Sequence, residues 1–180
     1  MSAIKDVGGK LASLRGGTAI EAFLNAYQGV SIIFIWGANG YTGGYNLGNC
    51  QGYDTGGCTV GLSGRIVFFS FLSTDFQWRK NNVVHELGHL FDGLHGGNPN
   101  SFAGNYASDR KQILRPFEGT TAWQMHPIYD PDSPFLTNSE MFADMFVAWT
   151  YGAWNTNPLN SVKVKDVITK MDEKMSGWLH

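Results

Sequence analysis

The chain has 180 residues, of which 43% are hydrophobic and 16% charged, so a single folded domain spanning 1–180 is expected and a disordered chain is excluded. The net charge of -2 gives no electrostatic reason to expect binding to nucleic acid or to an anionic membrane. The longest apolar run, at 30–36, is too short to cross a bilayer, so we expect no membrane insertion.

The N-terminal segment, residues 1–17, lacks the apolar core of a signal peptide. Either the protein is made without a secretion signal, or the chain is a mature domain cut from a longer precursor. The two cysteines, Cys50 and Cys58, lie in a glycine-rich stretch where a disulfide would indicate an oxidising compartment. The alternative is two free thiols, because spacing does not prove connectivity. We expect an extracellular or secreted monomer.

The first half of the chain predicts one helix and two strands. The sequence TAIE at 18–21 has the form of a capping box, and the helix that it begins should end near residue 28. The apolar segments 30–36 and 65–72 are typical of buried strands. Between them, residues 37–64 are rich in glycine and predict a long loop or an irregular hairpin.

The second half predicts helices. One should begin near residue 76 or 80 and end at 91, and others should span 140–151 and 161–175, where apolar residues recur at helical spacing. Residues 96–136 are rich in Gly, Asn, Pro and Ser, so only a short helix near 108–114 is expected there.

The motif that carries chemistry is HELGH, at residues 85–89. Residues four apart on a helix lie on the same face, so His85 and His89 can coordinate one metal ion. Glu86 then lies beside a metal-bound water, as in the HExxH motif of zinc peptidases. The motif predicts a Zn²⁺ site with Glu86 as the general base.

A catalytic zinc site has three protein ligands, and Glu140 is the first candidate for the third. Asp144, one helical turn later, would accept the free ring N–H of His85 and fix its orientation. On spacing alone an equal alternative remains, because acidic residues in the first turn of a helix also cap it and favour its dipole.

His95 is the second candidate for the third ligand, since its offset from His89 matches the HExxHxxGxxH motif of metzincins. The sequence near Met125 is similar to the methionine turn of that clan. However, the glycine of the metzincin motif would fall at Asp92, and this chain has Gly93 instead. Glu140 is therefore favoured over His95.

HELGHLFDG, followed later by LTNSEMFADMFVAW, resembles the gluzincin arrangement HExxH…ExxxD. More narrowly, residues 79–150 resemble the catalytic domains of anthrax lethal factor and of the Pro-Pro endopeptidases. The resemblance implies three zinc ligands, a glutamate base and a supporting aspartate: His85, His89, Glu140, Glu86 and Asp144. It also implies an α+β fold, a zincin-like metallopeptidase domain with a small twisted sheet, an active-site helix and a mainly helical C-terminal half.

In the lethal-factor group a tyrosine seven residues before the ligand glutamate stabilises the transition state, and here that position is Ser133. Tyr129 is the nearest replacement and our candidate catalytic residue, with His126 as the alternative. The expected function is zinc-dependent cleavage of peptide or protein substrates. Two other hypotheses remain: a metzincin-type peptidase that uses His95, and an inactive binding module.

Overall fold

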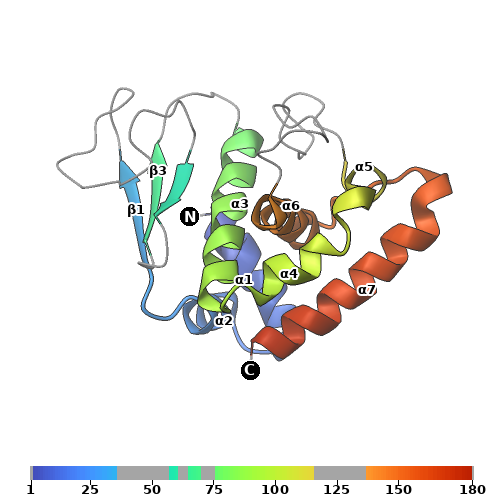
Figure 1. The fold of residues 1–180 in the computed structure, drawn as a ribbon. Helices are drawn as coiled ribbons and strands as arrows, with labels where there is room; N and C mark the ends of the chain where they lie inside the picture. Colours follow the sequence, from blue (N-terminus) through green and yellow to red (C-terminus); the bar gives the residue numbers. More distant parts are fainter. Residues whose placement is uncertain (1, 36–56, 61–64, 70–75, 116–136, 180) are drawn as a thin grey trace.

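The computed structural model describes residues 2–35, 57–60, 65–69, 76–115 and 137–179. Within these residues helices dominate, and they pack around α3 and α6 (Figure 1). In chain order the helices are α1 (Ser2–Arg15), α2 (Ala19–Ala26), α3 (Phe76–Leu94), α4 (Asn98–Gly104), α5 (Arg110–Ile113), α6 (Asn138–Tyr151) and α7 (Ser161–Trp178), with short 3-10 helices at Ala107–Asp109 and Pro158–Asn160. None of the described helices combines the length and apolarity needed to cross a lipid bilayer.

Three short strands lie on one side of α3, namely β1 (Ser31–Ile35), β2 (Gly57–Val60) and β3 (Arg65–Phe69). Their order is β1-β3-β2, with β1 parallel to β3 and β2 antiparallel to it. Ile33 pairs with Val67, and Cys58 pairs with Val67 from the other side. β1 and β3 fall within the segments that the sequence predicts as strands.

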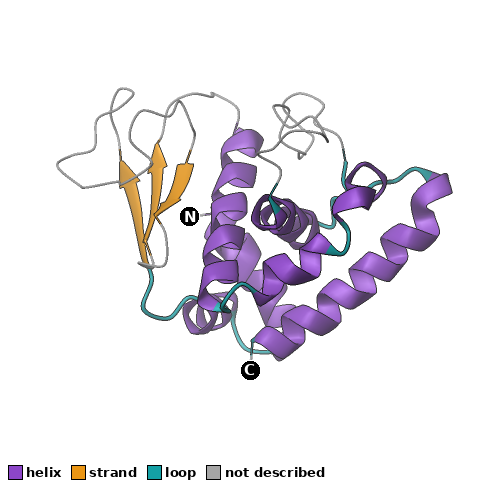
Figure 2. Cartoon of the chain, in the orientation of Figure 1, coloured by secondary structure: helices purple, strands orange, loops and turns teal. Residues whose placement is uncertain are grey.

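The expected fold class, an α+β zincin-like domain organised by a small twisted sheet, is wrong. Most of the described residues are helical, and helices account for most of the ribbon in Figure 2. The buried apolar side chains among the described residues come from the helices and the segments that join them. Among the side chains whose burial the structure describes, the helices therefore form a hydrophobic core with α6 at its centre.

Among the described helices α6 is the most buried, since every residue from Met141 to Trp149 is inaccessible or nearly so. Phe142 and Phe146 pack with Phe91 of α3, at ring-centroid distances of 6.3 and 5.7 Å. At the other side, the Trp149 ring nitrogen donates a hydrogen bond of 2.7 Å to Asp172 of α7. These contacts fix α6 between α3 and α7.

Helix α7 presents one apolar stripe to the core, formed by Val164, Val167, Met171 and Met175. This spacing follows the helical repeat, and it confirms the amphipathic helix predicted over 161–175. Helix α2 confirms the capping box, since the Thr18 hydroxyl accepts from the Glu21 backbone and the Glu21 carboxylate accepts from the Thr18 backbone. The helices α1 and α4 were not predicted.

Candidate metal centre

Two helices that are far apart in the sequence meet at HELGH. The glycine of the motif, Gly88, lies where α3 crosses α6, and a Cβ atom built on it would lie 2.9 Å from the Ala143 Cα. Real Cβ contacts are longer than this, so the glycine allows the two helix backbones to approach closely. Close approach at Gly88 brings the first turn of α6, which carries Glu140, over the His85 and His89 face of α3.

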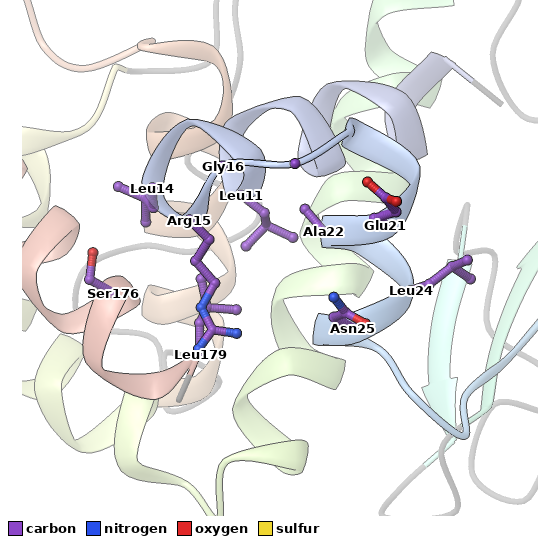
Figure 3. Close-up of a pocket in the computed structure, with 11 residues that line it drawn as sticks. Leu11, Leu14, Arg15, Gly16, Glu21, Ala22, Leu24, Asn25, Ser176 and Leu179 are labelled. Atoms are coloured by element: carbon purple, nitrogen blue, oxygen red, sulfur yellow. The ribbon is translucent and has the colours of Figure 1, made fainter.

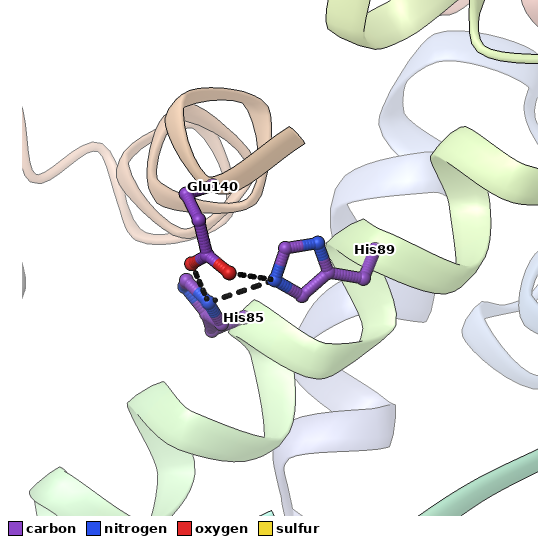
Figure 4. A group of neighbouring side chains, drawn as sticks. All are labelled: His85, His89 and Glu140. Atoms are coloured by element: carbon purple, nitrogen blue, oxygen red, sulfur yellow. Dashed lines mark hydrogen bonds and ion pairs between the residues drawn. The ribbon is translucent and has the colours of Figure 1, made fainter. Parts of the chain in front are cut away.

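Glu140 reaches both histidines (Figure 4). Its Oε2 lies 3.1 Å from His85 Nε2, and its Oε1 lies 3.3 Å from His89 Nε2. The two Nε2 atoms are themselves 3.1 Å apart. Thr137 caps the N-terminus of α6, and its hydroxyl accepts a hydrogen bond from the Glu140 backbone and so fixes the first turn.

In the part of the chain that the structure describes, these three residues form the cluster whose ligand atoms could hold a metal ion. Two ligands of a tetrahedral zinc ion at ordinary bond lengths are about 3.3 Å apart. The three measured separations are close to this value. The side chains of His89 and Glu140 are 16% and 23% exposed, so an ion and a water molecule can reach the cluster.

The orientation of His85 is fixed from behind by Asp144, whose Oδ1 lies 3.1 Å from His85 Nδ1. A neutral His85 that keeps its proton on Nδ1 presents a lone pair at Nε2. His89 Nδ1 lies 3.0 Å from the Ser139 hydroxyl, which can hold that ring in the same way. Two nitrogen lone pairs and a carboxylate then converge on one point, an arrangement that needs a positive charge between them and that fits a metal ion.

The pKa shifts in the metal-free protein reflect the same need for positive charge. Burial alone would lower the pKa of His85, but the Asp144 and Glu140 carboxylates outweigh it and raise the pKa to about 10. Burial alone would raise the pKa of Glu140, but the hydrogen bonds and charges of His85 and His89 hold it well below its usual range. Without a metal, the additional proton on His85 supplies the positive charge.

Asp144 is 1% exposed, and its Oδ2 pairs with the guanidinium of Arg110, which is also buried. Neither Arg110 nor Ser139 is predicted from the sequence as a site residue. Ser139 precedes Glu140 directly, so its place at the cluster follows from the local sequence. Arg110 lies 34 residues from Asp144 and carries no local signal of this contact.

The other predicted site residues are placed differently. Glu86 is 7% exposed and follows His85 on α3. His95 lies after the end of α3 and is not part of the cluster; its ring packs on Phe91 at 4.2 Å between centroids, and its buried Nε2 has no hydrogen-bond partner among the described residues. Several predicted positions fall outside the described residues: Cys50, Met125, His126, Tyr129 and Ser133.

Asp92, the residue that departs from the metzincin motif, accepts hydrogen bonds from the backbone and side chain of Asn100, at 2.8 and 3.1 Å. It therefore ties the end of α3 to α4. A separate cavity of about 820 Å³ lies between α1, α2 and α7 (Figure 3). It is lined by Leu11, Arg15 and Leu24 among others, and no residue of the cluster contributes to it.

No protein family, curated protein or solved structure matches this chain. The gluzincin resemblance therefore stays a prediction that is carried by the motif residues.

Proposed function

We propose that the protein is a zinc-dependent endopeptidase with His85, His89 and Glu140 as ligands and Glu86 as the general base. The observation that supports this most strongly is the convergence of the three ligand atoms, at separations of 3.1 to 3.3 Å, from helices that are distant in sequence. Two imidazoles and one carboxylate are a donor set of catalytic zinc sites. They also suit iron(II), but a base directly after the first histidine serves hydrolysis.

Each residue has a distinct role in this proposal. When bound, zinc would lower the pKa of its water towards about 7 and polarise the scissile carbonyl. Glu86 accepts a proton as water attacks that carbonyl, and then donates it to the leaving amine. Asp144 holds His85 by its Nδ1 atom so that Nε2 faces the cluster. Tyr129 is our candidate for stabilising the oxyanion.

Glu86→Gln separates catalysis from metal binding. Glutamine has nearly the same shape but accepts no proton, so hydrolysis of a peptide library should fall by roughly 10²-fold or more while zinc affinity is retained. The measurement is cleavage by the zinc-loaded protein, with and without a chelator. Glu173→Gln is the matched control, because Glu173 is an exposed acid on α7.

Undiminished cleavage by the Glu86→Gln protein would contradict the role of Glu86 as the base. If the zinc-loaded natural protein cleaves no member of the library, the endopeptidase proposal fails, and the inactive binding module becomes the better description.

A further inference from the structure

The buried ion pair between Arg110 and Asp144 extends the metal cluster by one more residue. One carboxylate oxygen of Asp144 lies 3.1 Å from His85 Nδ1, and the other pairs with the Arg110 guanidinium. Both side chains of the ion pair are almost completely shielded, at 5% and 1% exposure. Arg110 therefore lies in a chain of contacts that ends at a candidate ligand, although it cannot reach a substrate itself.

A carboxylate as buried as that of Asp144 needs a counter-charge, because removal from water penalises an unpaired charge. Arg110 supplies this charge from the side opposite His85. A guanidinium donor also limits rotation of the carboxylate, since its planar geometry favours one orientation. Fixing one oxygen on Arg110 leaves the other aimed at His85.

The pair is not needed merely to attach α5, because other contacts anchor this segment. The Asn155 backbone donates to the Ile113 carbonyl at 2.9 Å, and the Arg115 side chain donates to the Trp154 carbonyl at 3.1 Å. On the opposite side, Lys163 of α7 pairs with Asp109 at 2.6 Å. The backbone of Arg110 is thus held independently, and its side chain reaches Asp144 from a fixed base.

We infer that Arg110 is a positioning residue of the metal centre: it orients the Asp144 carboxylate, which in turn holds His85 with Nε2 towards the metal. This inference rests on the metal site of the proposed function. It adds a contact from α5 to a site whose ligands come from α3 and α6.

Zinc affinity tests the inference, with a chromophoric chelator as the competitor. Arg110→Met should weaken zinc binding by about tenfold, the lower end of the usual effect of residues that support metal ligands. Arg110→Lys should weaken it by less, because the ammonium keeps the charge but loses the planar donor geometry. Circular dichroism checks the fold of each variant. If Arg110→Met does not fold, the zinc affinity of Arg110→Lys tests the inference instead. An Arg110→Lys protein that binds zinc as tightly as the natural protein overturns the inference.

Two comparisons separate positioning from simple anchoring. In an Asp144→Asn background, Arg110→Met should cause no further loss, because the residue acts through the Asp144 carboxylate. Lys163→Met, the matched control, breaks the neighbouring anchor of the same segment and should leave zinc affinity unchanged. An equal loss in Lys163→Met, or a full further loss in the Asp144→Asn background, would overturn the inference.

Different results would contradict the proposed metal site and the proposed role of Arg110. If the natural protein binds no zinc, both the metal site and the role of Arg110 fall. If the natural protein binds zinc and folded Arg110→Met binds it equally well, only the role of Arg110 falls.

Discussion

At the scale of single residues, His85 combines burial, charged partners and a proposed role as a metal ligand. It contacts Glu140 with one ring nitrogen and Asp144 with the other, each at 3.1 Å. Its raised pKa, about 10, keeps the ring protonated in the metal-free protein well above neutral pH. A metal ligand must be a neutral imidazole, so in the proposed site protons and zinc would compete for this ring.

The competition predicts an unusual pH dependence. Zinc affinity should rise by about tenfold per pH unit from 6.5 to at least 8.5, because His85 must lose its proton throughout this range. Chelator-buffered zinc titrations at several pH values measure this slope. A histidine with the ordinary pKa of 6.5 would give an affinity that levels off above about pH 7.5, and such a plateau would contradict the account.

The raised pKa of His85 also makes the stability of the metal-free protein depend on pH. The folded-state pKa of His85 lies above the ordinary value of 6.5, so the ion pairs contribute fully below pH 6.5. This contribution is lost as the pH rises through about 10.

At the scale of elements, the crossing of α3 and α6 builds the candidate metal centre. Gly88 lies against Ala143 at this crossing, and Phe91 packs on Phe142 and Phe146 further along α3. The geometry of Glu140 relative to the histidines therefore depends on how closely the two helices approach.

Gly88→Ala tests this dependence. Alanine ordinarily favours a helix by about 1 kcal/mol over glycine, but here the added methyl group would force α6 away, at a cost of about 1–3 kcal/mol. We expect a lower free energy of unfolding in urea together with weaker zinc binding. Gly177→Ala is the matched control, since a Cβ there meets nothing within 4 Å and should not destabilise. Equal behaviour of the two variants would contradict the role of Gly88.

The sequence predicted α2, α3, α6 and α7 because their capping residues or apolar spacing are local signals. It missed α1 because Gly8 and Gly9 are poor helix formers. The structure shows a packing reason for the first of them, since a Cβ on Gly8 would overlap the Ala19 carbonyl of α2. Helix α4 was missed because its Pro99 suggests a loop, whereas proline is tolerated in the first turn of a helix.

The residues of the candidate site can also be divided into those with a local sequence signal and those whose contacts depend on tertiary packing. His85, Glu86 and His89 form a local pattern, and Glu140 with Asp144 forms another, so both were candidates from the sequence. Their meeting depends on how α3 packs against α6, which no local pattern encodes. The Arg110 contact with Asp144 also depends on tertiary packing.

At the scale of the whole molecule, the fold class predicted from the sequence is wrong. The strand-forming segments predict a sheet as the organising layer of an α+β domain, but the described structure is mostly helical. Apolar periodicity identifies single elements and does not say which of them forms the centre. In this chain α6 takes that place, with α3 on one side and α4 and α7 on the other.

The residues of the proposed metal centre belong to helices of the core. Glu140 lies in the first turn of a helix that is buried along most of its length, and His85 and His89 belong to a helix that packs on it. A metal ion bound there would join two elements of the core that lie 55 residues apart in the sequence.

The most direct test of the central claim is the zinc content of the purified protein after dialysis against zinc and then against buffer. We expect one zinc ion per natural chain, one per His95→Ala chain, and almost none for Glu140→Ala. Loss of zinc from His95→Ala with retention in Glu140→Ala would contradict the assignment of Glu140 as the third ligand and favour His95.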